Sequence, residues 1–414
     1  GKFIKFVSLI FILWFYATLT GLSPSVLRSA TMFSIIAIAQ ARKYNTNIFN
    51  TLSVSCFALL LYNPYLIMEV GFQLSFLAVL GIVSIQPWIY EKWQPKTWLM
   101  NQIWIITSVS LGAQIATFPL GLLYFHQFPN YFLFSNLIVI PVSTVILGYG
   151  ILMFALGKIS AIGAICGKGF SYTVWFLNES VKVVDKTPGA LIQGISTSIF
   201  ETWIIYVLTI FLMLYIYKKH LRFLFISLTT CILLLSLQTA ESYSIKKQKA
   251  IIIYNVPKIS GYDFVSGNNT IFLADSSLIH NSNRMLFHIK HNWWERSVTN
   301  QHQIENNKTI IYSDENINIK NNFIQFGSKR IAIVDSLPRI KSSLTTKLKV
   351  DLIILSKNPK IKISDLQKWL EFKKIIIDSS NSEWRNENWK KECENLKINF
   401  YSVIDSGAYV EGLL

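Results

Sequence analysis

Long apolar runs recur along the first 240 residues of the chain and are missing from the rest. An α-helix rises about 1.5 Å per residue, so about 20 apolar residues are needed to cross the hydrocarbon core of a bilayer. The seventh run is the weakest, because Lys168 and three glycines interrupt it, and an amphipathic or re-entrant helix is the alternative there. The pattern predicts about nine candidate spans, at residues 6–20, 26–41, 48–62, 68–89, 101–125, 131–156, 160–180, 199–217 and 221–239.

The remainder of the chain, residues 243–414, alternates short β-rich runs with polar segments. Two helices are expected, one from Ser364 to Phe372 and one from Ser382 to Leu396, where the Ser382 hydroxyl can cap the first turn. Segment 281–323 is rich in asparagine and is expected to hold loops and edge strands. Strands alternating with helices favour a layered α/β sheet. The predicted strands are 251–254, 270–273, 330–334, 351–355 and 374–377.

Composition supports this division into an α-helical polytopic membrane domain, residues 1–242, and a small soluble α/β domain, residues 243–414. The chain is 51% hydrophobic and 15% charged, whereas soluble domains carry about a quarter charged residues, which argues against a single soluble globule. Residues 1–242 hold 14 Lys and Arg against 6 Asp and Glu, and residues 243–414 hold 25 against 17, so each part has a net charge of +8. The four cysteines are scattered and form no disulfide framework. Because the chain begins with Gly1 and enters an apolar run at once, we expect N-terminal sequence to be missing.

The placement of lysine and arginine between the spans predicts the orientation of the chain. Loops on the cytoplasmic side carry an excess of these residues. With nine spans, almost all the loop cations fall on one side, which is therefore cytoplasmic, and the C-terminal domain emerges on the periplasmic side. The exception is segment 181–198, and removing the seventh span would reverse the tail. The cations that define the cytoplasmic side are Lys2, Lys5, Arg42, Lys43, Lys92, Lys96, Lys158, Lys218, Lys219 and Arg222.

Polar side chains interrupt the second and fourth spans. Arg28 lies about one turn inside the second span, after Ser23 and Pro24, which suit a helix start. It is either a cation facing a polar path or a side chain that reaches back to the interface. In the fourth span, Glu69 and Gln73 share a helix face.

With Ser75, these two residues must face protein or water, so they line a conduit or hold helices together. An ion pair between Glu69 and Arg28 would explain both charges.

A third polar stretch extends from Gln114 to Pro141. Pro119 and Pro141 lie within spans and each leaves a carbonyl without its helical donor, which predicts two helix breaks. Gln114 and Asn136 can satisfy the freed groups. His126, in an aromatic loop, is interpreted as an interface residue.

These three stretches contain long ordered motifs. They are Gly-Leu-Ser-Pro-Ser-Val-Leu-Arg at 21–28, Asn-Pro followed by Gly-Phe-Gln-Leu-Ser-Phe within 63–76, and Thr-Phe-Pro-Leu followed by Asn and Pro within 117–141. The motifs resemble the competence domain of the ComEC family, the inner-membrane DNA-uptake channel of naturally transformable bacteria. This resemblance implies import of single-stranded DNA in the bacterial inner membrane, surrounded by membrane lipid. The candidate lining is Arg28, Glu69, Gln73, Ser75, Gln114 and Asn136.

The resemblance also implies a periplasmic DNA receptor and cytosolic DNA-binding proteins or a motor as partners, and no nucleotide-binding loop is visible in the chain itself. Whether the path lies within one chain or between the subunits of a homo-oligomer is left open.

The tail resembles the metallo-β-lactamase-like domain with which many members of this family end. The family's His-x-His-x-Asp-His motif is replaced here by Leu355-Ser356-Lys357-Asn358-Pro359-Lys360-Ile361-Lys362, and the Asp-Val-Gly-Gln-Gly-Asp signature by Asn255-Val256-Pro257-Lys258-Ile259-Ser260. A dinuclear zinc site needs imidazoles and carboxylates. The tail is therefore predicted to be a degenerate, non-catalytic domain without metal or other cofactor.

The chain is accordingly not expected to be an enzyme. Trp293, Trp294 and segment 357–362 are candidate DNA contacts, with an ordinary solvated lysine-rich face as the alternative. Two other functions compete with DNA import. One is transport of a small or lipid-linked solute, and the other is a membrane-anchored nuclease, whose cleavage a chelator would stop.

Overall fold

The computed structural model describes residues 2–42, 47–156, 160–306, 310–336 and 347–413. These residues form two compact units, Gly1–Cys231 and Ile232–Leu414, and each unit is described by itself. Lys43 and Lys158, two of the cations that define the predicted orientation, lie outside the described residues.

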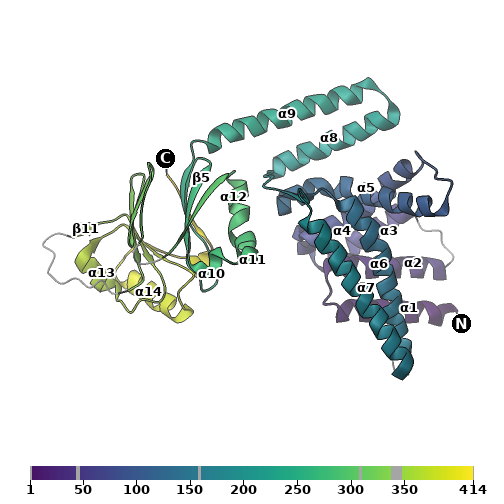
Figure 1. Ribbon diagram of the computed structural model, residues 1–414, viewed down its shortest axis with the longest axis horizontal. Coiled ribbons are helices and arrows are strands. Elements are labelled where there is room, and N and C mark those ends of the chain that lie inside the picture. The colour runs from purple at the N-terminus through teal and green to yellow at the C-terminus, as the bar shows by residue number, and fades with distance from the viewer. Residues whose placement is uncertain (1, 43–46, 157–159, 307–309, 337–346, 414) are drawn as a thin grey trace. The chain divides into compact units, whose positions relative to one another are not determined.

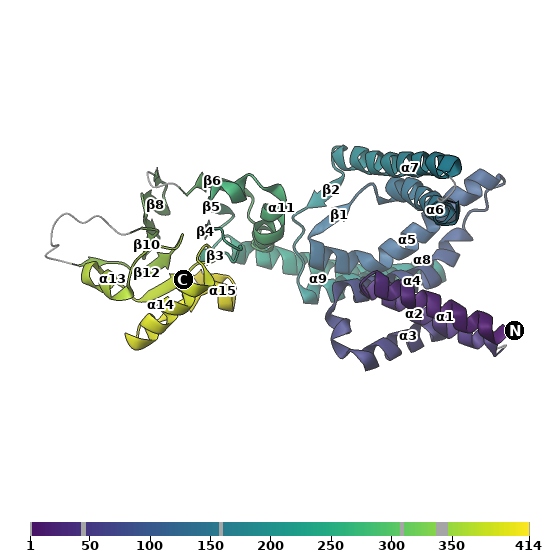
Figure 2. The same ribbon diagram turned by 90° about the horizontal axis from the view of Figure 1, so that it is seen from below.

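A helix is present at each of the nine predicted spans (Figures 1 and 2). By length and hydropathy, α4, α5, α6, α8 and α9 can cross a membrane. The apolar part of α1 (Phe6–Leu19) and helix α3 are shorter. These five helices confirm the predicted helical membrane domain. The helices are α1 (Lys2–Leu19), α2 (Pro24–Ala41), α3 (Ile48–Tyr62), α4 (Val70–Tyr90), α5 (Trp98–Phe125), α6 (Phe132–Leu156), α7 (Ser160–Lys186), α8 (Ile199–Lys218) and α9 (Leu221–Ile245).

Among the described residues, the most extensive helix contact in the first unit is between α4 and α5, whose backbones meet at two glycines. A Cβ atom on Gly81 would overlap the carbonyl oxygen of Gly112 and lie 2.5 Å from Cβ of Ala116. Small residues allow this approach, and dispersion contacts between close backbones hold membrane helices together where no hydrophobic force does. Helix α5 also contacts α6 and α8, and α2 contacts α1, α3 and α4. The pair α4–α5 is therefore the centre of the helical packing.

The two prolines inside predicted spans do not break their helices. Helix α5 continues through Pro119, and α6 continues through Pro141. The predicted breaks are therefore corrected to prolines within continuous helices. Each still removes one hydrogen bond from its helix, and neighbouring helices can compensate for such losses in a membrane.

Two loops of the first unit are joined by a small antiparallel sheet. Strand β1 (Gln127–Pro129), after α5, pairs with β2 (Leu191–Gln193), after α7. The backbone of His126 accepts hydrogen bonds from Gly194 and Ile195, and Asn130 Nδ2 donates to the carbonyl oxygen of Gly189 at 2.7 Å. The loops that follow α5 and α7 therefore lie on the same side of the helices.

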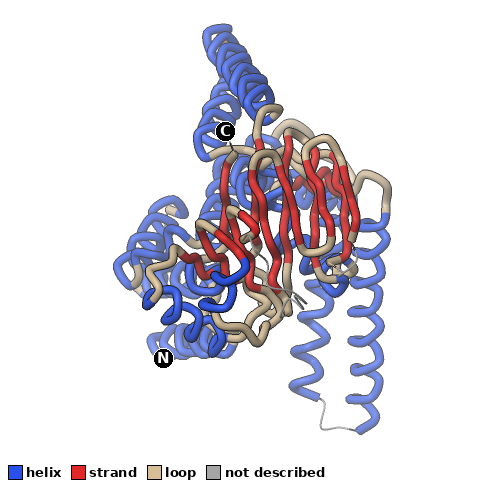
Figure 3. The backbone as a smooth tube through the Cα atoms, turned by 90° about the vertical axis from the view of Figure 1, so that its left-hand side faces the viewer, coloured by secondary structure: helices blue, strands red, loops and turns tan. Residues whose placement is uncertain are grey.

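The second unit is built around two facing β-sheets (Figure 3). One sheet has the strand order β16-β3-β4-β5-β6, and the other has the order β15-β14-β12-β10-β9-β8-β7. The strands of the first sheet are β16 (Tyr409–Gly412), β3 (Lys249–Ile253), β4 (Gly261–Ser266), β5 (Asn269–Ala274) and β6 (Asn300–Glu305). Those of the second are β15 (Phe400–Ser402), β14 (Lys374–Ile377), β12 (Leu352–Leu355), β10 (Lys329–Val334), β9 (Phe323–Phe326), β8 (Ile317–Lys320) and β7 (Ile311–Ser313).

Three apolar clusters show that this unit has four layers. Between the sheets, alternate residues such as Ile251, Phe264 and Ile354 form a central core. The outer face of the first sheet packs against short helices, including α10 (Ser276–Ile279), α11 (Ser282–Met285) and α12 (His291–Glu295). The outer face of the second sheet packs against α13 (Ile363–Trp369) and α14 (Glu383–Asn395) (Figure 1). Because β12 and β14 are covered on both faces, they read as runs of leucine and isoleucine without alternating polar positions.

All five predicted strands of the tail are present, but three details of the tail differ from the prediction. Ser382 occupies the N-cap of α14 without a side-chain hydrogen bond to the first turn. The first predicted helix ends at Trp369, because Leu370 and Glu371 form β13 and pair with β11 (Leu348–Lys349). Segment 281–323 contains the predicted edge strands β6 and β7, together with short helices that the sequence did not indicate.

Candidate functional site

Predicted site residues take part in three of the polar side-chain pairs that join the membrane helices; among the others, Tyr90 OH on α4 donates to Asn101 Oδ1 on α5 at 2.8 Å. Arg28 on α2 donates through Nε to Ser75 Oγ on α4. Gln73 on α4 accepts from Tyr124 OH on α5 at 3.1 Å. Buried polar groups without partners are costly in hydrocarbon, so these pairs make the polar positions tolerable inside the helical unit.

The third pair links the next two helices, where Asn136 Nδ2 on α6 donates to Ser110 Oγ on α5 at 3.0 Å. Ser110 is buried, and Asn136 is half-buried. Ser110 and Tyr124 were not among the predicted site residues, and their partners on the neighbouring helices are not apparent from the sequence. Of the predicted residues, four of the six thus take part in contacts between helices.

Glu69 and Gln114 do not join these pairs through any recorded hydrogen bond of the described residues. Glu69 is exposed at the N-cap position of α4 and does not form the ion pair considered with Arg28. Its place is electrostatically favourable, because a carboxylate near a helix N-terminus interacts with the helix dipole. Gln114 is half-buried on α5. Ser23, expected as a helix cap, occupies the N-cap of α2 without a side-chain hydrogen bond.

A cavity of about 790 Å³ lies between α4, α5 and α8. Its walls are mostly apolar, including Leu77, Ile115 and Met213, with hydroxyls from Ser84, Tyr206 and Thr209 and the carboxylate of Glu91, which would repel phosphate. None of the six candidate residues lines it. Since a hydrated polyanion needs polar or charged walls, this cavity does not fit single-stranded DNA by its lining.

In the tail, a lysine and an asparagine follow the strand after which the sequence resemblance places the family's metal motif. Strand β12 ends at Leu355 and is followed by Ser356, Lys357 and Asn358. Lys357 Nζ forms an ion pair with Asp275 Oδ1 at 2.7 Å. Within the described parts of the chain, no three His, Cys, Asp or Glu side chains gather as metal ligands would. The chemistry present at this edge is thus that of an ion pair and hydroxyl groups.

Next to this edge, the buried carboxylate of Asp378 ties the two sheets together. It accepts from Tyr262 OH at 2.5 Å and from Asn381 Nδ2 at 2.9 Å, and Tyr262 belongs to the opposite sheet. Burial raises the pKa of Asp378 to about 6, while the hydrogen bonds from Ser380 and Tyr262 act in the opposite direction.

A second buried carboxylate, Asp263, accepts from Trp293 Nε1 at 2.5 Å and from Tyr254 OH at 2.9 Å. Burial also raises the pKa of Asp263 to about 6, against the hydrogen bonds from Thr270 and Trp293. Trp293 is fully buried, so its predicted role as a DNA contact is wrong. Trp294 beside it is half-buried and meets His291 edge to face.

The raised pKa of Asp378 predicts that the tail loses stability as pH rises. The ordinary value is 3.8, so the folded state holds the proton more tightly than the unfolded state. This contribution is fully present below about pH 4 and is lost as pH rises through about 6, at about 1.4 kcal/mol per pKa unit. We expect Asp378→Asn to flatten the decline in the urea midpoint of the tail between about pH 4 and pH 7.

Pulse proteolysis of the full chain in detergent, with a C-terminal epitope, measures this midpoint. The matched control is Asp365→Asn, at a half-exposed aspartate on α13 that pairs with Lys368; it should leave the decline as in the unmodified chain. Equal declines for the unmodified chain and Asp378→Asn would contradict the prediction.

Taken together, these features define a polytopic membrane protein that carries a four-layer α/β domain. Residues 1–219 match the family model described as competence protein, and residues 251–413 match the model of the ComEC C-terminal domain. The chain therefore belongs to the competence protein family, which confirms the resemblance found in its sequence.

The chain is similar to ComE operon protein 3 of Bacillus subtilis (strain 168), with 35% identity over 138 residues. The match covers 33% of this chain and 17% of that protein, so the chain spans well under two thirds of the curated relative it matches. No solved structure is significantly similar to the chain. The likeness of the tail to metallo-β-lactamases accordingly stays an interpretation, with which the four layers are consistent.

Proposed function

We propose that the chain forms a conduit in the bacterial inner membrane through which single-stranded DNA is imported during natural transformation. The observation that carries the proposal is the Arg28–Ser75 hydrogen bond between α2 and α4. Within the described part of the chain, the recorded partners of the Arg28 side chain are Ser75 and Met32, and neither is charged. No recorded ion pair among the described residues therefore competes with a passing anion for the guanidinium.

The other polar pairs extend this path in the proposal. Gln73 and Tyr124 join α4 to α5, and Ser110 and Asn136 join α5 to α6. Amides and hydroxyls can exchange their hydrogen bonds with those of water or of a nucleotide, whereas apolar walls cannot. Tyr124 also offers an aromatic face on which a base could stack. Glu69, Ser75 and Gln114 complete the proposed lining.

Replacing Arg28 tests this function. We expect Arg28→Ala to lower uptake of labelled DNA into the cytosol at least about tenfold, because a hydrogen bond to a charged group is worth roughly 1.5–3 kcal/mol and 1.4 kcal/mol is a factor of ten. Arg28→Lys should retain part of the uptake. The matched control is Arg42→Ala, at an exposed arginine that ends the same helix.

Immunoblots must show equal amounts of each variant in the membrane. The Arg28→Ala variant should be the only copy in the strain. If it is present in normal amounts and DNA uptake is unchanged, the proposed path is contradicted.

The proposed orientation places the tail on the periplasmic side. The pairing of β1 with β2 supports it, because the loops after α5 and α7 lie on one side only if α7 returns across the membrane beside α6. With α7 counted as a span, nine crossings separate the N-terminus from the tail.

Alkaline phosphatase, which is active only outside the cytoplasm, reports this orientation when fused to the chain. We expect an active enzyme when it follows Leu413 and an inactive one when it follows Lys218 between α8 and α9. The reverse result would mean that the tail is cytoplasmic.

The proposed partners are a periplasmic DNA receptor and cytosolic DNA-binding proteins or a motor, with membrane lipid around the helices. The alternative function, transport of a small or lipid-linked solute, is favoured by one observation, the apolar cavity between α4, α5 and α8. The two functions differ in salt dependence. Binding of single-stranded DNA to the purified chain should weaken steeply as salt rises, while binding of an apolar solute should not.

A further inference from the structure

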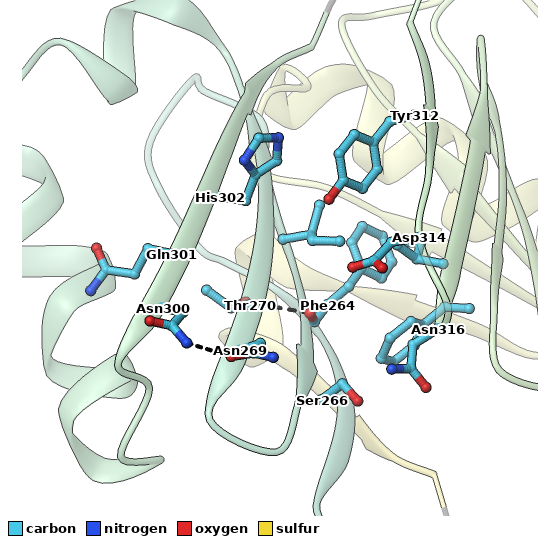
Figure 4. Close-up of a pocket in the computed structure, with 13 residues that line it drawn as sticks. Phe264, Ser266, Asn269, Thr270, Asn300, Gln301, His302, Tyr312, Asp314 and Asn316 are labelled. Atoms are coloured by element: carbon cyan, nitrogen blue, oxygen red, sulfur yellow. Dashed lines mark hydrogen bonds between the residues drawn. The ribbon is translucent and has the colours of Figure 1, made fainter.

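A cleft of about 360 Å³ opens between the two sheets of the tail (Figure 4). It lies at one end of the sandwich, where the turn between β4 and β5 is formed. The edge with the Lys357–Asp275 ion pair is at the other end of the same strands, because Ser266 pairs with Asn269 while Gly261 pairs with Ala274, next to Asp275. The cleft is thus separate from the edge at which metal ligands would be expected, and its volume is typical of small-ligand sites.

Two aromatic rings form one wall of the cleft. His302 on β6 and Tyr312 on β7 come from the facing edges of the two sheets, and their rings stack with centroids 4.9 Å apart and planes 25° apart. His302 is exposed and Tyr312 is half-buried. A planar ligand can extend this stack, since bases stack on aromatic side chains with little dependence on sequence.

The remaining polar groups suit the edge of a base better than a phosphate. Side-chain amides of Asn269, Asn300 and Asn316 line the cleft, and Asn300 Nδ2 donates to Asn269 Oδ1 at 2.9 Å, which leaves the Asn269 and Asn316 N–H groups and the Asn300 oxygen for a ligand. Asp314 contributes a carboxylate, which repels phosphate but accepts hydrogen bonds from amino groups of bases. The cleft therefore combines a stacking surface with hydrogen-bonding groups and disfavours an anion inside it.

Cations lie outside the cleft at the same end of the domain. Lys249 Nζ donates to Asn316 Oδ1 at 3.1 Å. Lys246 and Lys247 are exposed at the end of α9, and the backbone of Lys246 lies against Gly267 in the β4–β5 turn. These lysines can contact a phosphate backbone whose base enters the cleft.

We propose that this cleft binds an unpaired base of single-stranded DNA, with Lys246, Lys247 and Lys249 holding the adjoining phosphates. The inference rests on the proposed function and names the part of the substrate that the tail recognises. A DNA strand bound in the cleft would lie beside the segment between the end of α9 at Ile245 and the start of β3 at Lys249.

Binding of two oligonucleotides to the purified full chain in nanodiscs tests the cleft. One is a fluorescent 12-mer of thymidylate, and the other is an abasic strand with the same number of phosphates. We expect the thymidylate strand to bind about tenfold more tightly at fixed salt, the effect of one stacked base. The variants Tyr312→Leu and His302→Ala should each remove most of this difference, and Trp384→Leu, at an exposed tryptophan on α14, should leave it intact.

Equal affinity of the unmodified chain for both strands would overturn the proposal, and so would an unchanged preference in both cleft variants. A photoreactive 4-thiothymidine strand should crosslink to peptides of β6 or β7, and crosslinks confined to other peptides would contradict it independently of protein stability. The proposed function is tested separately. Normal DNA uptake in the Arg28→Ala strain would contradict the proposed conduit, while binding of a base to the cleft could still be observed. Equal binding of the thymidylate and abasic strands would contradict base binding in the cleft, even if DNA uptake depends on Arg28.

Discussion

Gly81→Ala is expected to separate α4 from α5 and to lower sharply the amount of folded protein in the membrane. The added Cβ would overlap the carbonyl oxygen of Gly112, and backbone cannot swing away as a flexible side chain can. Overpacking of a close contact costs about 1–3 kcal/mol and occasionally more, and this contact lies at the centre of the helical packing. The amount of monodisperse chain recovered in detergent, together with its thermal midpoint, measures the effect.

Gly121→Ala provides the matched control, because it adds the same methyl group to α5 at a position with no atom within 4 Å. This variant should be recovered in normal amounts, and alanine should favour the helix slightly over glycine. Equal recovery and equal midpoints for both variants would show that α4 and α5 do not meet at their glycines.

Trp293→Ala is expected to destabilise the tail by about 3–5 kcal/mol, the usual cost of emptying the volume of a large aromatic side chain in a core. Trp293 is fully buried against Phe272, with ring centroids 5.4 Å apart. Its indole N–H also donates to Asp263, so the substitution leaves a buried carboxylate with one partner fewer. Pulse proteolysis of the full chain in urea, read through a C-terminal epitope, gives the change in the free energy of unfolding.

The control is Trp384→Ala, since Trp384 is 68% exposed. It should change stability by no more than about 0.5 kcal/mol, as surface substitutions do. If instead Trp293→Ala left the tail stable and weakened DNA binding, the side chain would be a surface contact and the described packing of α12 would be wrong.

The elements that sequence predicted best are those whose two faces are both buried. Strands β12 and β14 read as unbroken runs of leucine and isoleucine, because the second sheet is covered by the other sheet on one face and by helices on the other. Strand β4 was missed because Asp263 interrupts its pattern. Nothing in the sequence reveals that Tyr254, Thr270 and Trp293 surround this carboxylate.

The sequence predicted which polar residues of the candidate site lie in the helices, but it did not predict their hydrogen-bond partners. Arg28 and Ser75 are 47 residues apart, and only the contact between α2 and α4 brings them together. A charge inside an apolar run suggests that an opposite charge lies nearby, and Glu69 was therefore considered as the ion-pair partner of Arg28. The structure instead gives Arg28 a hydroxyl partner, and Glu69 lies at the start of α4, where the helix dipole favours it.

Crosslinking of DNA in transit tests the conduit most directly. Transforming DNA with photoreactive thymidines, stalled by a bulky group at its trailing end, would be irradiated in cells and the attached peptides identified. The account predicts attachment to α2, α4 and α5 around Arg28, Gln73 and Tyr124, and loss of these products in Arg28→Ala. Attachment confined to residues that line the apolar cavity, or none to the membrane helices while uptake proceeds, would contradict it.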